Sequence, residues 1–292
     1  MQDVKMKLGG AVTYWQAGPT YRADVERALA VNDVSLDMIP EPPSPHSLLR
    51  AALSQLCKGT VKDKGTELAV QGHKVPKHDG YEVVQINRDH CENQYHTLYS
   101  AKIIRDTEMI ESIGMSEVQL ATLTSLYQWR KSIVSAGDVT QTLVNIMHKL
   151  EGVPLRAGGG VFWVPDDNVP LLRAVADSMA ACTGLENQSI LVYSLRTVID
   201  EHAVRAVKDA LTKEINRDAG SIIEDLQGSF KEATAASRLQ RAKTLRGRVE
   251  AYELILGETL TSLRSVLALA DQAVTTAFTT LEADSVGAIF AG

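Results

Sequence analysis

The chain has 292 residues, of which 45% are hydrophobic and 23% charged, and its formal net charge is −6. This length suits about two domains that build their own cores, and the acidic balance argues against a dedicated nucleic-acid-binding protein. Aromatic residues make up only 5% of the chain, so we expect a largely aliphatic core and helical packing.

The sequence has no apolar run near the roughly 18–20 residues that a membrane-spanning helix needs. Residues 1–8 are not followed by the apolar segment of a signal peptide. The three cysteines, Cys57, Cys91 and Cys182, are odd in number and far apart, which suits reduced thiols rather than a disulfide framework. We therefore expect a cytoplasmic protein with no membrane contact.

Residues 1–105 mix helix and strand signals. Tyr14-Trp15 has strand character, 21–31 has helical spacing, and a second helix is predicted over 47–56, after the prolines of 40–45. These elements predict a small α+β domain.

The same region contains one hairpin signal. Segments 80–87 and 94–104 are rich in β-branched and aromatic residues, and the residues between them suit a turn. We expect the strand at Tyr14 and a strand at Val61 to complete the sheet that this hairpin begins.

Residues 116–193 show the order helix, helix, hairpin. Ser116 and Gln119 have capping-box spacing, and Asp138 is predicted to cap the next helix. Segments 153–156 and 161–165 flank a glycine triplet and predict a β-hairpin. This order is typical of a winged helix.

A winged helix would present a recognition helix and a wing. The polar face of the second helix and the wing supply the candidate contact residues Gln141, Asn145, Lys149 and Arg156. Because this face is only weakly basic, protein interaction is as open an interpretation as nucleic-acid binding.

Residues 194–283 carry a strong heptad signal. Apolar residues recur in steps of three and four, most regularly at Leu245, Val249, Tyr252, Leu256, Leu260, Leu263, Leu267, Ala270, Val274, Ala277 and Leu281. The pattern weakens between Gly228 and Ser237, which predicts a turn. We expect an antiparallel coiled-coil hairpin whose second arm runs about 70 Å from 237 to 283, followed by a flexible tail over 284–292.

Six cations gather around the predicted turn against two acids, Glu232 and Glu250, so the local balance is 6 − 2 = +4. They are Lys231, Arg238, Arg241, Lys243, Arg246 and Arg248. Such a cluster can contact a polyanion or an acidic partner. The alternative is a solvated helix face in which these cations pair with neighbouring acids.

The search for catalytic motifs finds no phosphate loop, nucleophile elbow or zinc-protease signature. The glycine triplet suits a wing tip better than a phosphate site, because no helix begins directly after it. Four histidines, His73, His78, His90 and His96, share one region with Cys57 and Cys91, which are zinc ligand types at irregular spacing. We therefore assign no catalytic, cofactor or metal residue, and a metal-dependent enzyme is the third hypothesis.

Three segments together resemble an uncharacterised family of mainly helical proteins found in phages, plasmids and bacterial genomes. They are Pro42-Pro43-Ser44-Pro45 with Leu48, Ala51 and Leu53, then 156–165, and then the helical tail with Tyr252 and Leu256. The resemblance covers most of the chain. It implies a phage or mobile-element setting and no assigned activity.

Taken together, the sequence predicts a mainly α protein with an α+β N-terminal part. A winged-helix-like module follows, and a long antiparallel coiled-coil hairpin ends the chain. Because catalytic motifs are missing, we expect a non-enzymatic interaction or assembly protein that self-associates or binds a protein partner. The alternative is nucleic-acid binding through the basic hairpin end or the winged-helix-like module.

Overall fold

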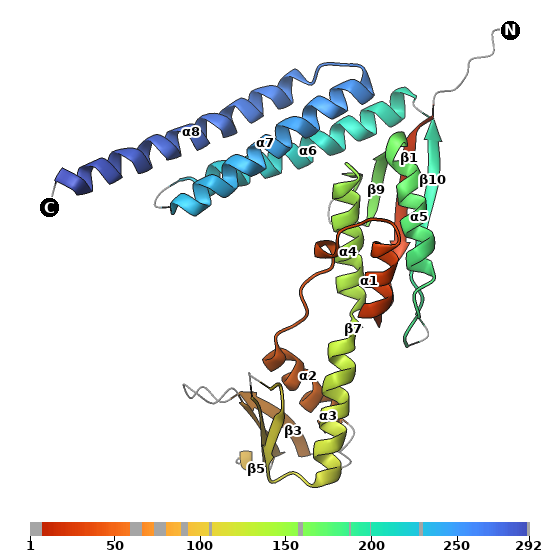
Figure 1. Cartoon of the computed structure of the whole chain (residues 1–292), viewed down its shortest axis with the longest axis vertical. Coiled ribbons are helices and arrows are strands. Elements are labelled where there is room, and N and C mark those ends of the chain that lie inside the picture. Colours follow the sequence, from red (N-terminus) through yellow and green to blue (C-terminus); the bar gives the residue numbers. More distant parts are fainter. Residues whose placement is uncertain are drawn as a thin grey trace.

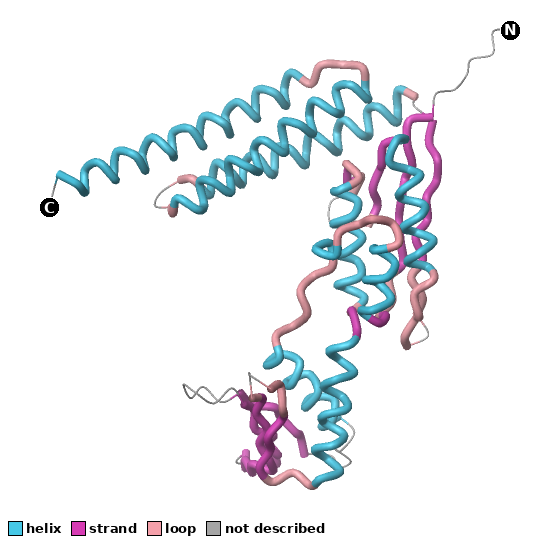
Figure 2. The backbone as a smooth tube through the Cα atoms, viewed as in Figure 1, coloured by secondary structure: helices cyan, strands magenta, loops and turns pink. Residues whose placement is uncertain are grey.

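The computed structural model describes residues 8–58, 66–72, 80–88, 93–104, 107–156, 160–186, 188–198, 200–227 and 230–290. It is a mixed α/β structure with 59% helix. Figure 1 shows three parts: a central sheet with its helices, a small lobe at one end, and a helical arm at the other. Figure 2 shows the strands gathered mainly in two separate places, one in the centre and one in the lobe.

The central sheet has the order β10-β1-β9-β8 and is antiparallel throughout. Its strands are β1 (Leu8–Gln16), β8 (Val153–Pro154), β9 (Val161–Pro165) and β10 (Leu191–Val198). The strand at Tyr14 therefore pairs with β9 and β10, and our prediction that it joins the hairpin at 80–104 was wrong. Strand signals are local, whereas the partner of a strand depends on contacts far away in the chain.

Each face of the central sheet packs against helices, and neighbouring residues of a strand point to opposite faces. Ala11 and Phe162 belong to one core with α1 (Arg22–Ala30), α4 (Ala136–Lys149) and α5 (Val169–Ala180). Trp163 belongs to a second core with the helical arm, and Val12 packs against it. The sheet thus holds the arm on one face and three helices on the other.

The small lobe is inserted between two halves of the central part. It consists of α2 (Pro45–Lys58), β3 (Thr66–Gly72), β4 (Gly80–Arg88), β5 (Asn93–Ile103), β6 (Ile110–Ile113) and α3 (Glu117–Ser132), with the sheet order β3-β4-β5-β6. The helix over 47–56 and the hairpin of β4 and β5 are confirmed. Val61 lies outside the described residues.

A short two-stranded ladder closes the neck of the lobe. Strand β2 (Thr20–Tyr21) pairs with β7 (Ile133–Val134), directly after α3. On the other side the chain enters the lobe through η1 (Leu36–Met38) and the prolines of 40–45. The proline cluster is therefore the entrance of an insertion.

Helix α3 begins as predicted, with Ser116 and Gln119 forming a capping box. The cap of α4 is Ser135 rather than Asp138, whose backbone N–H donates to the Ser135 hydroxyl. Asp138 lies three positions further on, in the first turn, where a carboxylate also complements the helix dipole. The prediction placed the cap three residues too late.

The predicted hairpin after α4 is present as β8 and β9. Strand β9 also pairs with β1 on its other side, so it is an inner strand of the central sheet. Helix α3 contributes Leu123 and Tyr127 to the lobe core, whereas α4 packs in the central core. After η2 (Asp166–Asn168) and α5, the chain returns to the sheet as β10.

The helical arm consists of α6 (Glu201–Asp225), α7 (Glu232–Leu256) and α8 (Thr261–Phe290). The turn predicted between 228 and 237 lies between α6 and α7, but the second arm is not continuous. Gly257 ends α7 with a φ of +69°, a left-handed C-cap that glycine adopts readily. The prediction missed this break because the heptad spacing continues through it, with Tyr252, Leu260 and Leu263 all buried.

The two ends of the predicted hairpin also differ from those in the structure. Residues 194–198 belong to β10, and α6 begins only at Glu201. At the other end α8 continues to Phe290, so residues 284–290 are helical instead of a flexible tail. Only the backbone of 282–290 is described.

Candidate interaction surface on the helical arm

Beside the apolar core that it shares with the sheet, the arm contacts the central part through a largely buried polar cluster. The Glu214 carboxylate on α6 is 3% exposed and accepts a hydrogen bond of 2.8 Å from Nη1 of Arg248 on α7. Nη2 of Arg248 donates to the carbonyl of Gly152, before β8, at 2.5 Å. The Tyr252 hydroxyl donates to the carbonyl of Glu151. These contacts hold the arm to the turn that follows α4.

His148, at the end of α4, borders this cluster, with Nδ1 3.7 Å from the Glu214 carboxylate. Desolvation lowers the pKa of His148 below its usual 6.5, and Arg248 lowers it further, while Glu214 opposes the shift. The neutral imidazole is therefore the favoured form at neutral pH. The His148 ring lies edge-on to the Phe162 ring, with the two ring centroids 5.7 Å apart. We interpret the cluster as the structural joint of the arm.

Most of the predicted cationic cluster is paired within the arm. Arg238 lies 2.8 Å from Asp225, Arg241 lies 3.2 Å from Asp218, and Arg246 pairs with Asp271 on α8. Arg248 lies in the joint, where its side chain is 13% exposed and pairs with Glu214, so it is not available to a polyanion. Lys231 and Lys243 are exposed. The arrangement matches the alternative of paired neighbouring charges.

Only some of the predicted recognition-helix and wing residues are free of contacts within the protein. The Asn145 side chain donates to the Met38 carbonyl at 2.8 Å and accepts from Gln141 at 2.8 Å, which ties both to the central part. Lys149 and Arg156 are exposed. The face therefore offers fewer side chains for bases or phosphates than the sequence indicated.

The predicted metal region is only partly described, because His73, His78, His90 and Cys91 lie outside the described residues. Cys57 packs inside the lobe with its sulfur 3.7 Å from the Tyr99 hydroxyl, and burial raises the pKa of its thiol. His96 is exposed on β5. Among the residues that the structure describes, no three His, Cys, Asp or Glu side chains gather as metal ligands.

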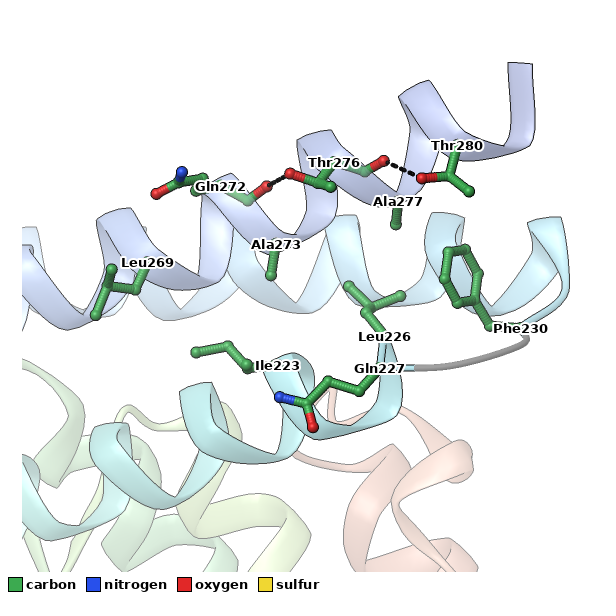
Figure 3. Close-up of a pocket in the computed structure, with 10 residues that line it drawn as sticks. All are labelled: Ile223, Leu226, Gln227, Phe230, Leu269, Gln272, Ala273, Thr276, Ala277 and Thr280. Atoms are coloured by element: carbon green, nitrogen blue, oxygen red, sulfur yellow. Dashed lines mark hydrogen bonds between the residues drawn. The ribbon is translucent and has the colours of Figure 1, made fainter. Parts of the chain in front are cut away.

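The arm carries a groove that was not predicted from the sequence. It is an open groove of about 580 Å³ between the end of α6 and the middle of α8 (Figure 3). Its lining is mainly apolar and contains no charged side chain. The lining residues are Ile223, Leu226, Gln227, Phe230, Leu269, Gln272, Ala273, Thr276, Ala277 and Thr280.

The threonines of the groove use their hydroxyls within α8. Thr276 donates to the carbonyl of Gln272 at 2.9 Å, and Thr280 donates to the carbonyl of Thr276 at 3.0 Å (Figure 3). Because each hydroxyl is satisfied four residues back, the threonine methyl groups can join the apolar lining. Leu269 adds an exposed apolar side chain, 58% of which is accessible.

A sequence signal for this groove exists. The exposed positions Leu269, Gln272 and Thr276 repeat the three-and-four spacing of the buried seam on another face of the same helix. The heptad prediction followed only the large apolar residues, so it missed a face made of small and hydroxyl side chains.

The sequence of the chain also matches a known protein family. A family model described as "Family of unknown function (DUF6744)" matches residues 8–284. The chain belongs to this family. The match spans all three parts of the fold, from β1 to α8. The family is described as one of unknown function, and its description names no phage or plasmid origin. No curated protein and no solved structure matches the chain.

None of the described helices is both long and apolar enough to span a membrane.

Proposed function

We propose that this DUF6744 member is a non-enzymatic interaction or assembly protein whose binding surface lies on the helical arm. The groove between α6 and α8 is the observation that carries the proposal. In this groove Leu269 is exposed, and the side chains of Ile223, Leu226 and Phe230 are only partly buried. Burying such apolar surface drives association.

The shape of the groove indicates the kind of ligand. Two helices border it, and its α8 wall presents residues at three-and-four spacing. An amphipathic helix lays its apolar face into a groove of this kind. The groove also has no charged lining residue that would recognise a phosphate or a metal ion. We infer that a protein helix is the ligand.

Nucleic-acid binding is the alternative, and it has less support. Four of the six predicted cations are paired with carboxylates, which leaves Lys231 and Lys243 on the arm and Lys149 and Arg156 near the hairpin. The helix, helix, hairpin order keeps a winged-helix interpretation open, but β9 lies inside a larger sheet. Measuring wild-type binding to DNA and RNA at low salt tests this alternative.

The metal-dependent enzyme and the phage or mobile-element setting, the two other expectations from the sequence, each have a simple test. Elemental analysis of protein purified without a chelator or a His tag tests the metal-dependent enzyme. The genes that surround family members test the phage or mobile-element setting.

Photo-cross-linking tests the proposed function. A photoreactive amino acid placed at position 269 should form protein cross-links in cells of the source organism, identified by mass spectrometry. The same residue at Leu254, which is 85% exposed on α7 but outside the groove, is the matched control. Cross-links at 269 and not at 254 support the proposal. Equal labelling at both positions, or none at 269, overturns it.

A further inference from the structure

We propose that the free edge of β10 binds an extended segment of another protein, which joins the four-stranded central sheet as a further strand. This site is separate from the groove on the arm, so the inference goes beyond the proposed function and does not depend on it. It follows from the unpaired backbone of β10, from the apolar side chains beside it, and from the contrast with the opposite edge of the same sheet.

Strand β10 is a long edge strand with one free side. Within the part of the chain that the structure describes, it pairs with β1 alone, and Figure 1 shows it at the outer side of the central sheet. Its register with β1 runs without a bulge from Leu191 to Thr197. In an antiparallel ladder, every second residue of an edge strand directs its N–H and C=O groups away from its neighbour. These groups match the backbone of one further strand.

The opposite edge of the sheet is protected, whereas the edge of β10 is not. Strand β8 has only two residues, and one of them is Pro154, which has no backbone N–H to donate. Strand β10 has eight residues, no proline and no lysine. Its one charged residue, Arg196, already pairs with Asp166 at 2.7 Å. Proteins that avoid edge pairing place lysine, proline or a bulge on such a strand, so β10 is open to a partner.

Apolar side chains line the free edge on one face of the sheet. Tyr193 is 43% exposed and Leu195 is 58% exposed. The Tyr193 ring stacks on the ring of Tyr14, with the two centroids 4.9 Å apart. Val12 and Trp163 lie on the same face and pack against the arm. The apolar face therefore continues past the arm to the edge of the sheet.

These features define the chemistry of the bound segment. Its main chain is extended, because only a strand offers N–H and C=O groups along the whole edge. Its side chains alternate between the two faces of the sheet. Those beside Tyr193 and Leu195 should be apolar or aromatic, since cross-strand pairs of this kind stabilise a sheet. Those on the other face lie beside Ser194 and Arg196, where polar residues fit.

Peptides provide the first test. A library of random dodecapeptides displayed on yeast and selected against the full chain should yield peptides with apolar residues at every second position and no central proline. One selected peptide is then synthesised in two forms, N-methylated at its odd or at its even positions. Only the form whose methyl groups face β10 should lose affinity, by at least about tenfold, because N-methylation removes the donors and keeps the side chains. Equal effects of the two forms, helical spacing in the selected peptides, or no selected peptide would overturn the inference.

Two leucines locate the site. Leu195 on β10 and Leu269 in the groove of the arm are each 58% exposed. Leu195→Lys should weaken peptide binding at least about tenfold, because lysine on an edge strand opposes pairing, whereas Leu269→Lys should leave binding near the wild-type value. Circular dichroism should show that both variants keep the wild-type fold.

Two other outcomes would overturn the inference. Loss of binding in Leu269→Lys alone would place the peptide in the groove of the arm and leave the proposed function standing. A wild-type chain that sediments as a dimer, with a monomeric Leu195→Lys variant, would assign the edge of β10 to a second copy of this chain instead.

Discussion

Glu214 on α6 and Arg248 on α7 form a salt bridge of 2.8 Å whose side chains are only 2% and 13% exposed. The same arginine reaches the carbonyl of Gly152 in the central part. This charge pair therefore joins two helices of the arm to each other and to the turn before β8.

Removing one partner of this pair should destabilise the protein strongly. Arg248→Ala leaves the Glu214 carboxylate buried without its counter-charge, and we expect the free energy of unfolding to fall by about 3–5 kcal/mol. Urea denaturation followed by circular dichroism measures this change.

A surface pair provides the comparison. Arg238 pairs with Asp225 at 2.8 Å, and these side chains are 27% and 38% exposed. Arg238→Ala should cost no more than about 1 kcal/mol because solvent screens the pair. Similar losses in both variants would show that the Glu214 carboxylate is solvated rather than buried.

The stability of the joint should depend on pH through His148. The His148 side chain is 41% exposed, but the partial desolvation of its ring holds its pKa below 6.5 in the folded state. The unfolded chain therefore takes up the proton first as the pH falls, and the effect on stability is small. The contribution of the neutral ring is fully present above pH 6.5 and is lost as the pH falls through the lower folded-state pKa. His148→Gln should therefore show a smaller loss of stability between neutral and mildly acidic pH than the wild type.

An NMR titration of the His148 ring checks the same shift directly. Its midpoint should lie below 6.5. A midpoint above that value would reverse the predicted pH dependence, because the attraction of Glu214 would then exceed the cost of burial.

Gly247 inside α7 and Gly257 at its C-cap should respond to alanine in opposite directions. A methyl group at Gly257 or at Gly247 would meet no neighbouring atom within 4 Å. Gly257 has a φ of +69°, so Gly257→Ala should destabilise by about 1 kcal/mol. Gly247 lies inside the helix, so Gly247→Ala should stabilise by about 0.5–1 kcal/mol. Thermal denaturation measures whether each variant melts at a higher or a lower temperature than the wild type. A change of melting temperature in the same direction for both variants would contradict the left-handed cap.

Cys182 should react slowly with alkylating reagents in the folded protein. It is buried after α5, and desolvation raises the pKa of its thiol to about 11, so little thiolate exists at pH 8. Mass spectrometry after iodoacetamide treatment should find Cys182 unmodified in native protein and modified in urea. Rapid labelling without denaturant would show that α5 opens locally.

Local signals in the sequence predicted the elements of this fold. The capping box at Ser116, the hairpin of β4 and β5, and the heptad seam through Val249, Leu263 and Val274 each depend on residues close together in the chain. Spacing of this kind reflects the period of a helix or a strand, which neighbouring residues alone decide. This is why the periodicity of the arm was correct even where the number of helices was wrong.

The tertiary structure decided what those elements contact. Only the folded chain places β1 between β9 and β10, separates the halves of the central part by the inserted lobe, and pairs Arg246 with Asp271. These contacts join residues that are far apart in sequence, so no local pattern specifies them. The groove has the same origin, because the faces of α6 and α8 become its walls only when the turn at Gly257 brings α8 back along α6.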